Sequence, residues 1–304
     1  MNIPDLEAFL AVVETGSIVA ASARLHLTQP AVSRRVQSLE VRLGVALLDR
    51  QSKPLKPTAD GKEVYERGRR VIGSVADLVA SVAPDGAPSG DLRLGVPPFF
   101  AEKALAQPLD DLRAEFPRLS LRITAAWSPA LIPTVESGAI DAAVVLMPDD
   151  QPPPDKLAMH LLDRTSPILV ASRKLPLPRR KLTLRELAPY GWVLNQDGCG
   201  MRRSIRRALE AARLPFDVAV EAFGTELQLS LVARGLGIGA VTPAAFARSP
   251  SRGELRALAV PEFRSGVSAW LIHLHTLGRL AAPVARFSDQ LGAVFSADRP
   301  RGSS

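Results

Sequence analysis

The sequence predicts an α+β chain in two parts, a mainly α N-terminal part that ends in a long helix, followed by a larger α/β part. Apolar residues recur at helical spacing through the first part. The segment 84–90, PDGAPSG, has the composition of a linker. Beyond it, short runs that are apolar on both faces alternate with helical segments, so we expect a mostly parallel sheet with helices on both sides.

Residues 17–50 have the pattern of two helices joined by a tight turn at 25–27 and followed by a wing; residues 5–14 predict a helix before them. Thr28 is a suitable N-cap for the second helix of the pair, and Pro30 falls in its first turn, where its missing N–H is tolerated. One side of that helix carries an apolar stripe, Val32, Val36, Leu39 and Leu43. The opposite side carries Pro30, Ser33, Arg34 and Gln37. A helix-turn-helix uses such a face to enter the major groove of DNA.

The charge of the chain supports a polyanionic partner. The net charge is +7, and residues 17–58 hold seven Arg or Lys against two acidic residues, a net charge of +5. A solvated basic surface explains charge alone equally well, but charge placed on and just after a helix-turn-helix indicates DNA. Residues 45–57 predict two short wing strands, from which Arg50, Lys53 and Lys56 can reach phosphates or the minor groove.

A long helix is expected over residues 58–82. Its apolar residues follow a 4-3-4-3-4 spacing typical of a coiled-coil seam. The seam consists of Val64, Gly68, Val71, Val75, Leu78 and Val82. A seam of this length predicts a partner helix from a second subunit, and packing against its own domain is the alternative.

After the linker the patterns predict alternating strands and helices. The expected strands are 91–96, 119–125, 141–146, 168–171, 191–195, 218–222, 239–242 and 269–274. The expected helices are 101–116, 129–137, 184–187, 201–213, 225–234, one beginning at Pro243, and 283–295.

Composition excludes several classes of protein. The 304 residues and a hydrophobic fraction of 46% predict two or three packed domains. Cys199 is the only cysteine, so neither an intrachain disulfide nor a cysteine-based zinc site is expected. The N-terminus lacks the basic start of a signal peptide, and no apolar run approaches the roughly 20 residues that span a bilayer. The chain is therefore expected to be soluble and cytoplasmic, with no membrane partner.

The chain resembles the LysR-type transcriptional regulators along nearly its full length. The segment AASARLHLTQPAVSRRVQSLEVRLGVALLDR at 20–50 carries paired alanines, a Q-P-A-V-S helix start, and Leu-Glu and Leu-Gly pairs. PTADG at 57–61 resembles the start of the family's linker helix, with Asp60 where alanine is usual. ELQLSLVARGLGIGAVTP at 226–243 resembles a helix-and-strand segment of the family's effector domain.

This resemblance implies a domain organisation. It implies a winged helix-turn-helix at 1–58, a dimerising linker helix and hinge at 59–90, and an effector-binding domain at 91–298, with a disordered tail at 299–304. The effector domain is expected to have the fold of a type 2 periplasmic binding protein. Its first subdomain would comprise 91–162 with 268–298, its second 163–267, and a small molecule would bind between them. Family members usually assemble as a dimer of dimers, and RNA polymerase is a further candidate partner.

The candidate DNA contacts follow from the two helices and the wing. Gln29, Ser33 and Arg34 are placed for base edges, because Gln pairs with adenine and Arg with guanine. Pro30 and Ala31 can pack on thymine methyl groups. Ser17 begins a helix and can meet a phosphate, although a simple N-cap explains it too. The remaining candidates are Thr28, Arg35, Gln37, Arg50 and Lys53. Arg35 and Arg50 are expected at the DNA backbone, with a surface ion pair as the alternative for Arg35.

The candidate effector contacts are less polar than the resemblance implies. The family commonly presents Ser and Thr after the first strand of the effector domain, whereas this chain has Pro97, Phe99 and Phe100 there. With Trp127 and Ser128 after the next strand, they predict a partly apolar or aromatic effector. Packing of both phenylalanines against the sheet is the alternative. From the second subdomain the candidates are Asn195, Cys199, Thr225 and Pro243.

Other functions find less support. No GxSxG, HExxH or phosphate-loop motif is visible, so an enzyme is not expected, and neither is a metal or another cofactor. A solute-binding protein and a regulator that needs no ligand remain alternatives. Cys199 is either a redox sensor or, more commonly for such residues, a buried thiol. The basic helix 201–213 is either a solvated face or a contact within a tetramer.

Overall fold

The computed structural model describes residues 2–81, 87–101, 105–149, 151 and 154–297, without the side chains of residues 77, 80, 81, 99 and 101. The chain divides into two compact units. One comprises Met1–Pro88 with Ser137–Ala139, and the other comprises Ser89–Glu136 with Ile140–Ser304. The tail at 299–304 and Val82 of the predicted seam lie outside the described residues.

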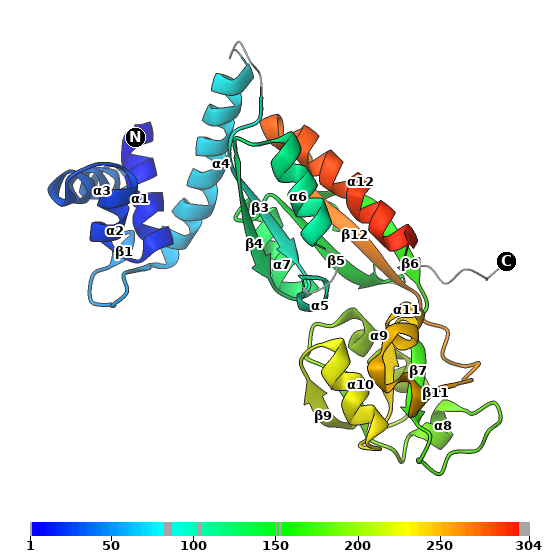
Figure 1. Ribbon diagram of the computed structural model, residues 1–304. Helices are drawn as coiled ribbons and strands as arrows, with labels where there is room; N and C mark the ends of the chain where they lie inside the picture. Colours follow the sequence, from blue (N-terminus) through cyan, green and yellow to red (C-terminus); the bar gives the residue numbers. More distant parts are fainter. Residues whose placement is uncertain (1, 82–86, 102–104, 150, 152–153, 298–304) are drawn as a thin grey trace. The chain divides into compact units, whose positions relative to one another are not determined.

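The N-terminal unit is a winged helix-turn-helix followed by a long helix (Figure 1). Its elements are α1 Ile3–Thr15, α2 Ile18–Arg24, α3 Gln29–Leu43, β1 Leu48–Asp49, β2 Lys56–Pro57 and α4 Ala59–Ser81. Asn2 caps α1 by accepting a hydrogen bond from the N–H of Asp5, and Gly16 ends it in the left-handed conformation. The three-helix arrangement, the wing and the long helix confirm the prediction for this part.

The core of this unit explains the spacing of α3. Val32, Val36 and Leu39 are fully buried against α1, as the stripe predicted. Leu43 is 39% exposed, so its predicted burial is wrong. It is the last helical residue before Gly44, whose left-handed conformation ends the helix, so little of the core reaches it.

The wing and α4 are joined through Thr58 and Gly61. Thr58 donates from its hydroxyl to the carbonyl of Ala46 and accepts from the N–H of Gly61 at 2.9 Å. A Cβ on Gly61 would lie 2.0 Å from the carbonyl oxygen of Leu47. Only glycine permits this approach, which explains the glycine in the PTADG segment.

The larger unit contains one five-stranded sheet and two smaller ones. Its strands are β3 Gly90–Val96, β4 Leu119–Ala125, β5 Ala142–Pro148, β6 Leu157–Thr165, β7 Ile168–Ser172, β8 Trp192–Asn195, β9 Val218–Ala222, β10 Gly239–Val241, β11 Leu255–Leu258 and β12 Val267–Leu274. Its helices are α5 Pro98–Ala101, α6 Ala106–Glu115, α7 Ser128–Glu136, α8 Leu184–Leu187, α9 Gly200–Ala211, α10 Thr225–Ala233, α11 Pro243–Arg248 and α12 Ala281–Ala297, with 3-10 turns at Pro250–Gly253 and Gly278–Leu280. The helix expected over 101–116 instead begins at Ala106, after the separate α5.

The strand directions correct the expectation of a mostly parallel sheet. In the order β4-β3-β5-β12-β6, β3 runs parallel to β4 and β5, whereas β12 runs antiparallel to both β5 and β6. β7 is antiparallel to β10 and β11, and β8 is parallel to β9. The sheet is mixed because β12 returns from the second subdomain between two strands of the first, a long-range placement that local pattern does not reveal.

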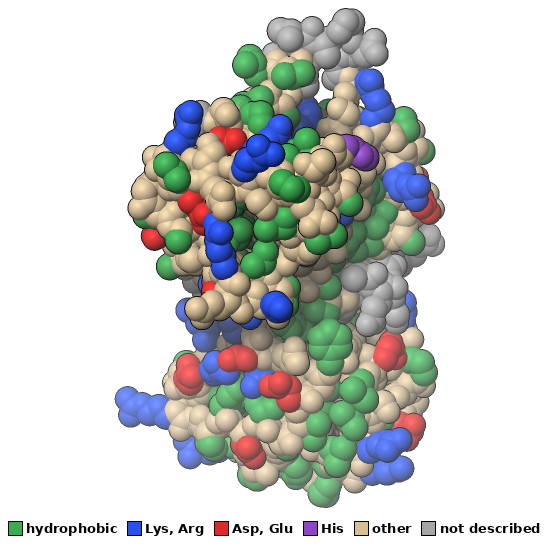
Figure 2. Space-filling view, turned by 90° about the vertical axis from the view of Figure 1, so that its left-hand side faces the viewer, with side chains coloured by type: hydrophobic (Ala, Val, Ile, Leu, Met, Phe, Trp, Pro, Cys, Tyr) green, Lys and Arg blue, Asp and Glu red, His purple; other side chains and the backbone are tan. Residues whose placement is uncertain are grey.

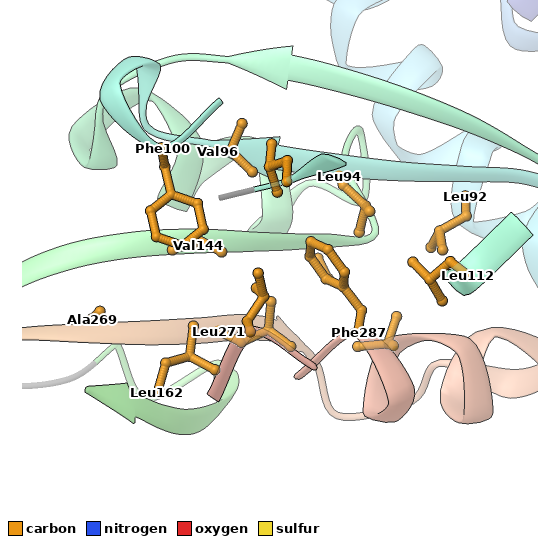
Figure 3. Close-up of a cluster of buried hydrophobic side chains, with 14 of the residues drawn as sticks. Leu92, Leu94, Val96, Phe100, Leu112, Val144, Leu162, Ala269, Leu271 and Phe287 are labelled. Carbon is orange, nitrogen blue, oxygen red and sulfur yellow. The ribbon is translucent and has the colours of Figure 1, made fainter. Parts of the chain in front are cut away.

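Helices cover both faces of the five-stranded sheet. Figure 1 shows α6 and α12 along one face, and α7 contributes Leu131 and Val135 to a separate core on the other. Figure 3 shows the first core, in which Leu112 of α6 and Phe287 of α12 meet the strands.

The sheet gives the extent of each subdomain. β6 was not predicted from the sequence, and it continues to Thr165, while β12 begins at Val267. The first subdomain therefore takes in residues 163–165 and Val267, which lie at the two ends of the range 163–267 expected for the second subdomain. The N–H of Asp149 donates to the carbonyl of Gly266 at 3.0 Å, which ties the chain after β5 to the chain before β12.

Candidate DNA-binding and effector sites

The N-terminal half of α3 presents the predicted face. Gln29, Pro30, Arg34 and Gln37 are exposed. Arg34 donates from Nε to the carbonyl of Pro30 at 3.3 Å, which holds its guanidinium along this face. Ser33 and Ala31 are half-buried beside it. The helix therefore offers one exposed surface that combines an amide, a guanidinium and an apolar ring.

The two N-cap positions differ from one another. Ser17 accepts a hydrogen bond from the N–H of Ala20 at 3.4 Å. It therefore caps α2, as the simple N-cap interpretation of this residue predicted. Thr28 occupies the N-cap position of α3 but makes no side-chain capping hydrogen bond, so the predicted cap is wrong in that respect. Its exposed hydroxyl is thus left facing solvent at the start of the recognition helix.

Glu40 positions the wing, a role that the sequence analysis missed. Its Oε1 accepts from the N–H of Leu47 at 2.9 Å and of Leu48 at 3.3 Å, and its Oε2 pairs with Arg50 at 2.9 Å. Arg50 retains 60% side-chain exposure, and Lys53 is exposed at the wing tip. The glutamate of the Leu-Glu pair is the feature of the sequence that could have indicated this role.

Arg35, another predicted DNA contact, is half-buried on α3.

The surface of the N-terminal unit carries charges of both signs. In Figure 2, Lys and Arg side chains recur over the part of this unit that faces the viewer, with Asp and Glu side chains among them. Arg34, Arg50 and Lys53 are exposed cations, which suit the phosphates of DNA.

The predicted seam of α4 divides into two parts. Val64 packs on the core of its own DNA-binding domain, and a Cβ on Gly68 would lie 2.6 Å from Leu6 Cδ1. Further along, Val71 is 38% and Leu78 is 68% exposed, with Val75 half-buried between them. Packing against its own domain therefore applies to the first part of the helix, and pairing of the exposed part with a helix of a second subunit stays a prediction.

Phe100 is a core residue, which corrects its assignment to the effector mouth. It is 4% exposed, and its ring centroid lies 4.9 Å from that of Phe295. Figure 3 shows its ring pointing into the core towards Val144. Pro97 is buried, and the side chain of Phe99 lies outside the described part of the structure.

Ser128 and Asn195 are also engaged within the framework. Ser128 is 2% exposed; its hydroxyl donates to the carbonyl of Leu146 at 3.1 Å and accepts from the N–H of that residue at 2.9 Å. The Asn195 amide donates to Gln228 at 2.8 Å and accepts from the N–H of Gly224 at 2.9 Å. The sequence places both residues at strand ends, but it does not reveal that Ser128 is bonded to the backbone of Leu146 and Asn195 to Gln228 and Gly224.

Trp127 of the first subdomain contacts the second subdomain. It is half-buried, and its indole N–H donates to Gln196 Oε1 at 3.4 Å. A Cβ on Gly198 would lie 3.0 Å from the Cβ of Trp127, and Gly198 has a φ of +102°. Arg203 donates across the same region to the carbonyl of Leu146 at 3.4 Å. Gln196 and Arg203 were missed because neither follows a recognisable motif.

Thr225 and Pro243 begin two helices of the second subdomain. Both are half-buried. The N-cap residues are Gly224 for α10 and Thr242 for α11, so Thr225 is the first helical residue of α10 and not its cap. Thr242 accepts from the N–H of Ala245 at 3.1 Å.

The basic helix α9 is held by neighbouring acidic residues. Arg202 pairs with Glu221 at 2.5 Å, and Arg206 pairs with Asp197 at 3.1 Å. Arg206 also lies over the ring of Phe216 at 5.2 Å. These contacts pair Arg202 and Arg206 of α9 with residues of their own subdomain.

Cys199 lies at the N-cap of α9 and is 3% exposed. Burial raises the pKa of its thiol, against the opposing effect of hydrogen bonds from the N–H groups of Arg202 and Met201. The thiolate is the reactive form, so a raised pKa lowers reactivity at neutral pH. The structure favours the buried-thiol interpretation over a redox sensor.

We predict that Cys199 in the folded protein reacts with a disulfide reagent such as DTNB at least about 10-fold more slowly than in urea-unfolded protein, because burial both excludes the reagent and suppresses the thiolate. Absorbance at equal pH measures both rates. Equal rates in the two states would contradict the burial described here.

The described residues were compared with the requirements for a membrane-spanning helix and for a metal-binding cluster. No helix among them is long and apolar enough to cross a bilayer. Among these same residues, no three His, Cys, Asp or Glu side chains come together in a group that would hold a metal ion.

A winged helix-turn-helix that exposes a polar and basic face defines a DNA-binding class of protein, and here an α/β domain follows it. Residues 3–62 match the bacterial regulatory helix-turn-helix protein of the lysR family, and residues 85–296 match the LysR substrate binding domain. The chain therefore belongs to the LysR family of transcriptional regulators.

Individual relatives agree with this membership. The chain is 26% identical over 289 residues to the HTH-type transcriptional regulator YeiE of Escherichia coli, covering 95% of this chain and 96% of that protein. It is 27% identical to a hydrogen peroxide-inducible genes activator of Dickeya chrysanthemi, covering 78% of each chain.

Solved structures show the same fold. A full-length OxyR variant of Pseudomonas aeruginosa superposes with a TM-score of 0.75 at 18% identity, covering 96% of this chain and 94% of that one. ArgP of Mycobacterium tuberculosis gives 0.70 at 23% identity, covering 96% and 97%. CbnR in complex with its target DNA gives 0.58 at 20% identity, covering 97% and 100%.

Proposed function

We propose that this regulator reads paired half-sites in double-stranded DNA through α3 and that a small molecule bound between its two α/β subdomains modulates this binding. The observation that supports the first part most directly is the exposed face of Gln29, Pro30, Arg34 and Gln37 at the N-terminal half of α3. In this proposal the protein acts in the cytoplasm without catalysing a reaction, and its DNA binding needs no cofactor besides the small molecule.

The wing adds contacts that do not depend on sequence. Arg50 is held by Glu40 near the base of the wing, and Lys53 stands at its tip. Flexible cations of this kind bind phosphates and set orientation, whereas base edges are read from the helix. From these positions we expect Arg34 to contact bases and Lys53 to contact phosphates.

The exposed part of α4 supports a homodimer. Val71 and Leu78 of the predicted seam are 38% and 68% exposed, with Val75 half-buried between them. Apolar residues at this spacing favour a second helix of the same kind. Two chains joined in this way present two recognition helices, and a dimer of dimers would present four, with RNA polymerase as a further partner at a promoter.

The contact at Trp127 supports an effector that is aromatic or apolar in part. Two hydrogen bonds join the subdomains here, one from the Trp127 indole to the Gln196 amide and one from the Arg203 guanidinium to the carbonyl of Leu146. Burial lowers the pKa of Arg203, although a guanidinium still carries its charge at neutral pH. An apolar ring with an acceptor group fits this set of side chains.

Footprinting of the full-length protein on the DNA upstream of its own gene, with and without aromatic and aliphatic acids, tests the proposal. We expect two protected half-sites and a ligand that changes their spacing, extent or affinity. Protection unaffected by any ligand that binds in a thermal-shift screen would contradict ligand control and favour a regulator that acts alone.

Trp127 provides a direct test of the effector position. We predict that an effector changes tryptophan fluorescence, because it would displace the indole contact with Gln196, and that Trp127→Phe abolishes this change. Trp192, which is 1% exposed, keeps contributing a constant signal in both proteins. A full fluorescence response in the Trp127→Phe variant would place the ligand elsewhere.

A further inference from the structure

Three of the four histidines, His160, His273 and His275, belong to β6, β12 and the residue after β12. The sequence predicts no metal site. His160 lies 113 residues before His273, so no sequence pattern connects them.

The sheet brings two of these imidazoles together. β6 is the edge strand and β12 is its neighbour, with Leu271 opposite His160 and Ala158 opposite His273. His160 and His273 are thus diagonal neighbours, a separation that long side chains can bridge. Their Nε2 atoms lie 3.0 Å apart, with ring centroids 5.1 Å apart and ring planes inclined by 19°.

The hydrogen bond of His273 Nδ1 shows that Nε2 is the ring nitrogen of His273 that can bind a metal ion. His273 Nδ1 lies 2.7 Å from the carbonyl oxygen of Leu274, so Nδ1 carries the proton that it donates and Nε2 presents a lone pair. A histidine that binds a metal almost always donates its other N–H in this way, which fixes the tautomer and the ring orientation. His273 is 8% exposed and held within the sheet, whereas His160 is exposed to solvent.

The separation of the two nitrogens fits a shared metal ion. A metal–nitrogen bond of about 2.0–2.1 Å, at nitrogen–metal–nitrogen angles between roughly 90° and 109°, places two nitrogens about 2.8–3.4 Å apart. The observed 3.0 Å lies in this interval.

We propose that His160 Nε2 and His273 Nε2 form a two-histidine site for a divalent transition-metal ion of the Cu²⁺, Ni²⁺ or Zn²⁺ class. Imidazole is a preferred ligand of these ions. Water completes the coordination, since no group of three His, Cys, Asp or Glu among the described residues is arranged for a metal. Binding requires His160 to carry its proton on Nδ1, which its exposure to solvent permits. The alternative is a direct N–H···N hydrogen bond between the rings without a metal.

Titration calorimetry of tag-free, full-length protein with Cu²⁺, Ni²⁺ and Zn²⁺ tests the site, with His160→Gln as the variant. We expect one equivalent to bind the wild-type protein. His160→Gln is expected to weaken this binding by more than the ~10–100-fold that loss of an outer-shell partner costs. His160 is exposed, and the melting curve of the variant without metal verifies that it folds.

His275→Gln is the matched control, because His275 is an exposed histidine two residues from His273. It is expected to bind like the wild-type protein, and the bound metal should raise the Tm of both but not that of His160→Gln. Absence of binding to the wild-type protein overturns the proposal in favour of the hydrogen bond. Binding that persists in His160→Gln, or is lost in His275→Gln, overturns it by placing the metal on other donors.

Discussion

Arg34→Ala is expected to weaken binding to the regulator's own operator by ~1–3 kcal/mol, or about 5–150-fold, and to reduce discrimination against altered half-sites. The guanidinium lies on the exposed face of α3, held by its hydrogen bond to the carbonyl of Pro30. A bidentate contact with guanine explains an effect of this size. Fluorescence anisotropy with the operator and with scrambled DNA, at one fixed salt concentration, measures both quantities.

Lys53→Ala is the matched comparison for that substitution. Its ammonium is exposed at the wing and is expected to bind phosphate. The variant should therefore lose affinity for operator and scrambled DNA equally, and the slope of affinity against salt should fall by about one. If Arg34→Ala discriminated between the two DNAs as well as the wild-type protein, α3 would not read the bases through Arg34.

Gln228→Leu is expected to destabilise the second subdomain by roughly 2–4 kcal/mol, because it leaves buried polar groups without partners. Gln228 is 2% exposed in α10. Its amide donates to the carbonyls of Val193 at 3.0 Å and Ala240 at 3.2 Å and accepts from Asn195 at 2.8 Å. It thus joins α10 to β8 and β10. Leucine has a similar volume, so the loss is of hydrogen bonds rather than of packing.

Urea denaturation followed by tryptophan fluorescence measures this effect, since Trp192 lies in the same subdomain core. Leu227→Ala is the control, because the adjacent Leu227 is 51% exposed and its truncation should change stability by less than about 0.5 kcal/mol. A loss below about 1 kcal/mol in Gln228→Leu would mean that the three hydrogen bonds contribute little.

The DNA-binding region was predictable because its signals are local. The spacing of Val32, Val36 and Leu39 identifies the buried side of α3, and the opposite side follows from helix geometry. Gly44 and the short run after it mark the end of the helix and the wing. The role of Glu40 was not visible, because it depends on the wing folding back on α3.

The effector region was only partly predictable. Sequence periodicity located loops at strand ends but not the direction of each side chain there. Phe100 therefore turned out to be a core residue, and Ser128 to be bonded to the backbone of Leu146. Trp127 does lie where the subdomains meet, and Gln196 joins it from a distant loop.

The sequence by itself determined the two-part organisation, the exposed face of α3 and the family, since each depends on residues within a few helical turns or on a contiguous motif. Only the tertiary structure decided which part of α4 is used within the chain, how Gln228 links two strands, and that His160 meets His273. These contacts join residues that are distant in the chain. They depend on strand order, on register and on the direction of β12, which no local pattern encodes.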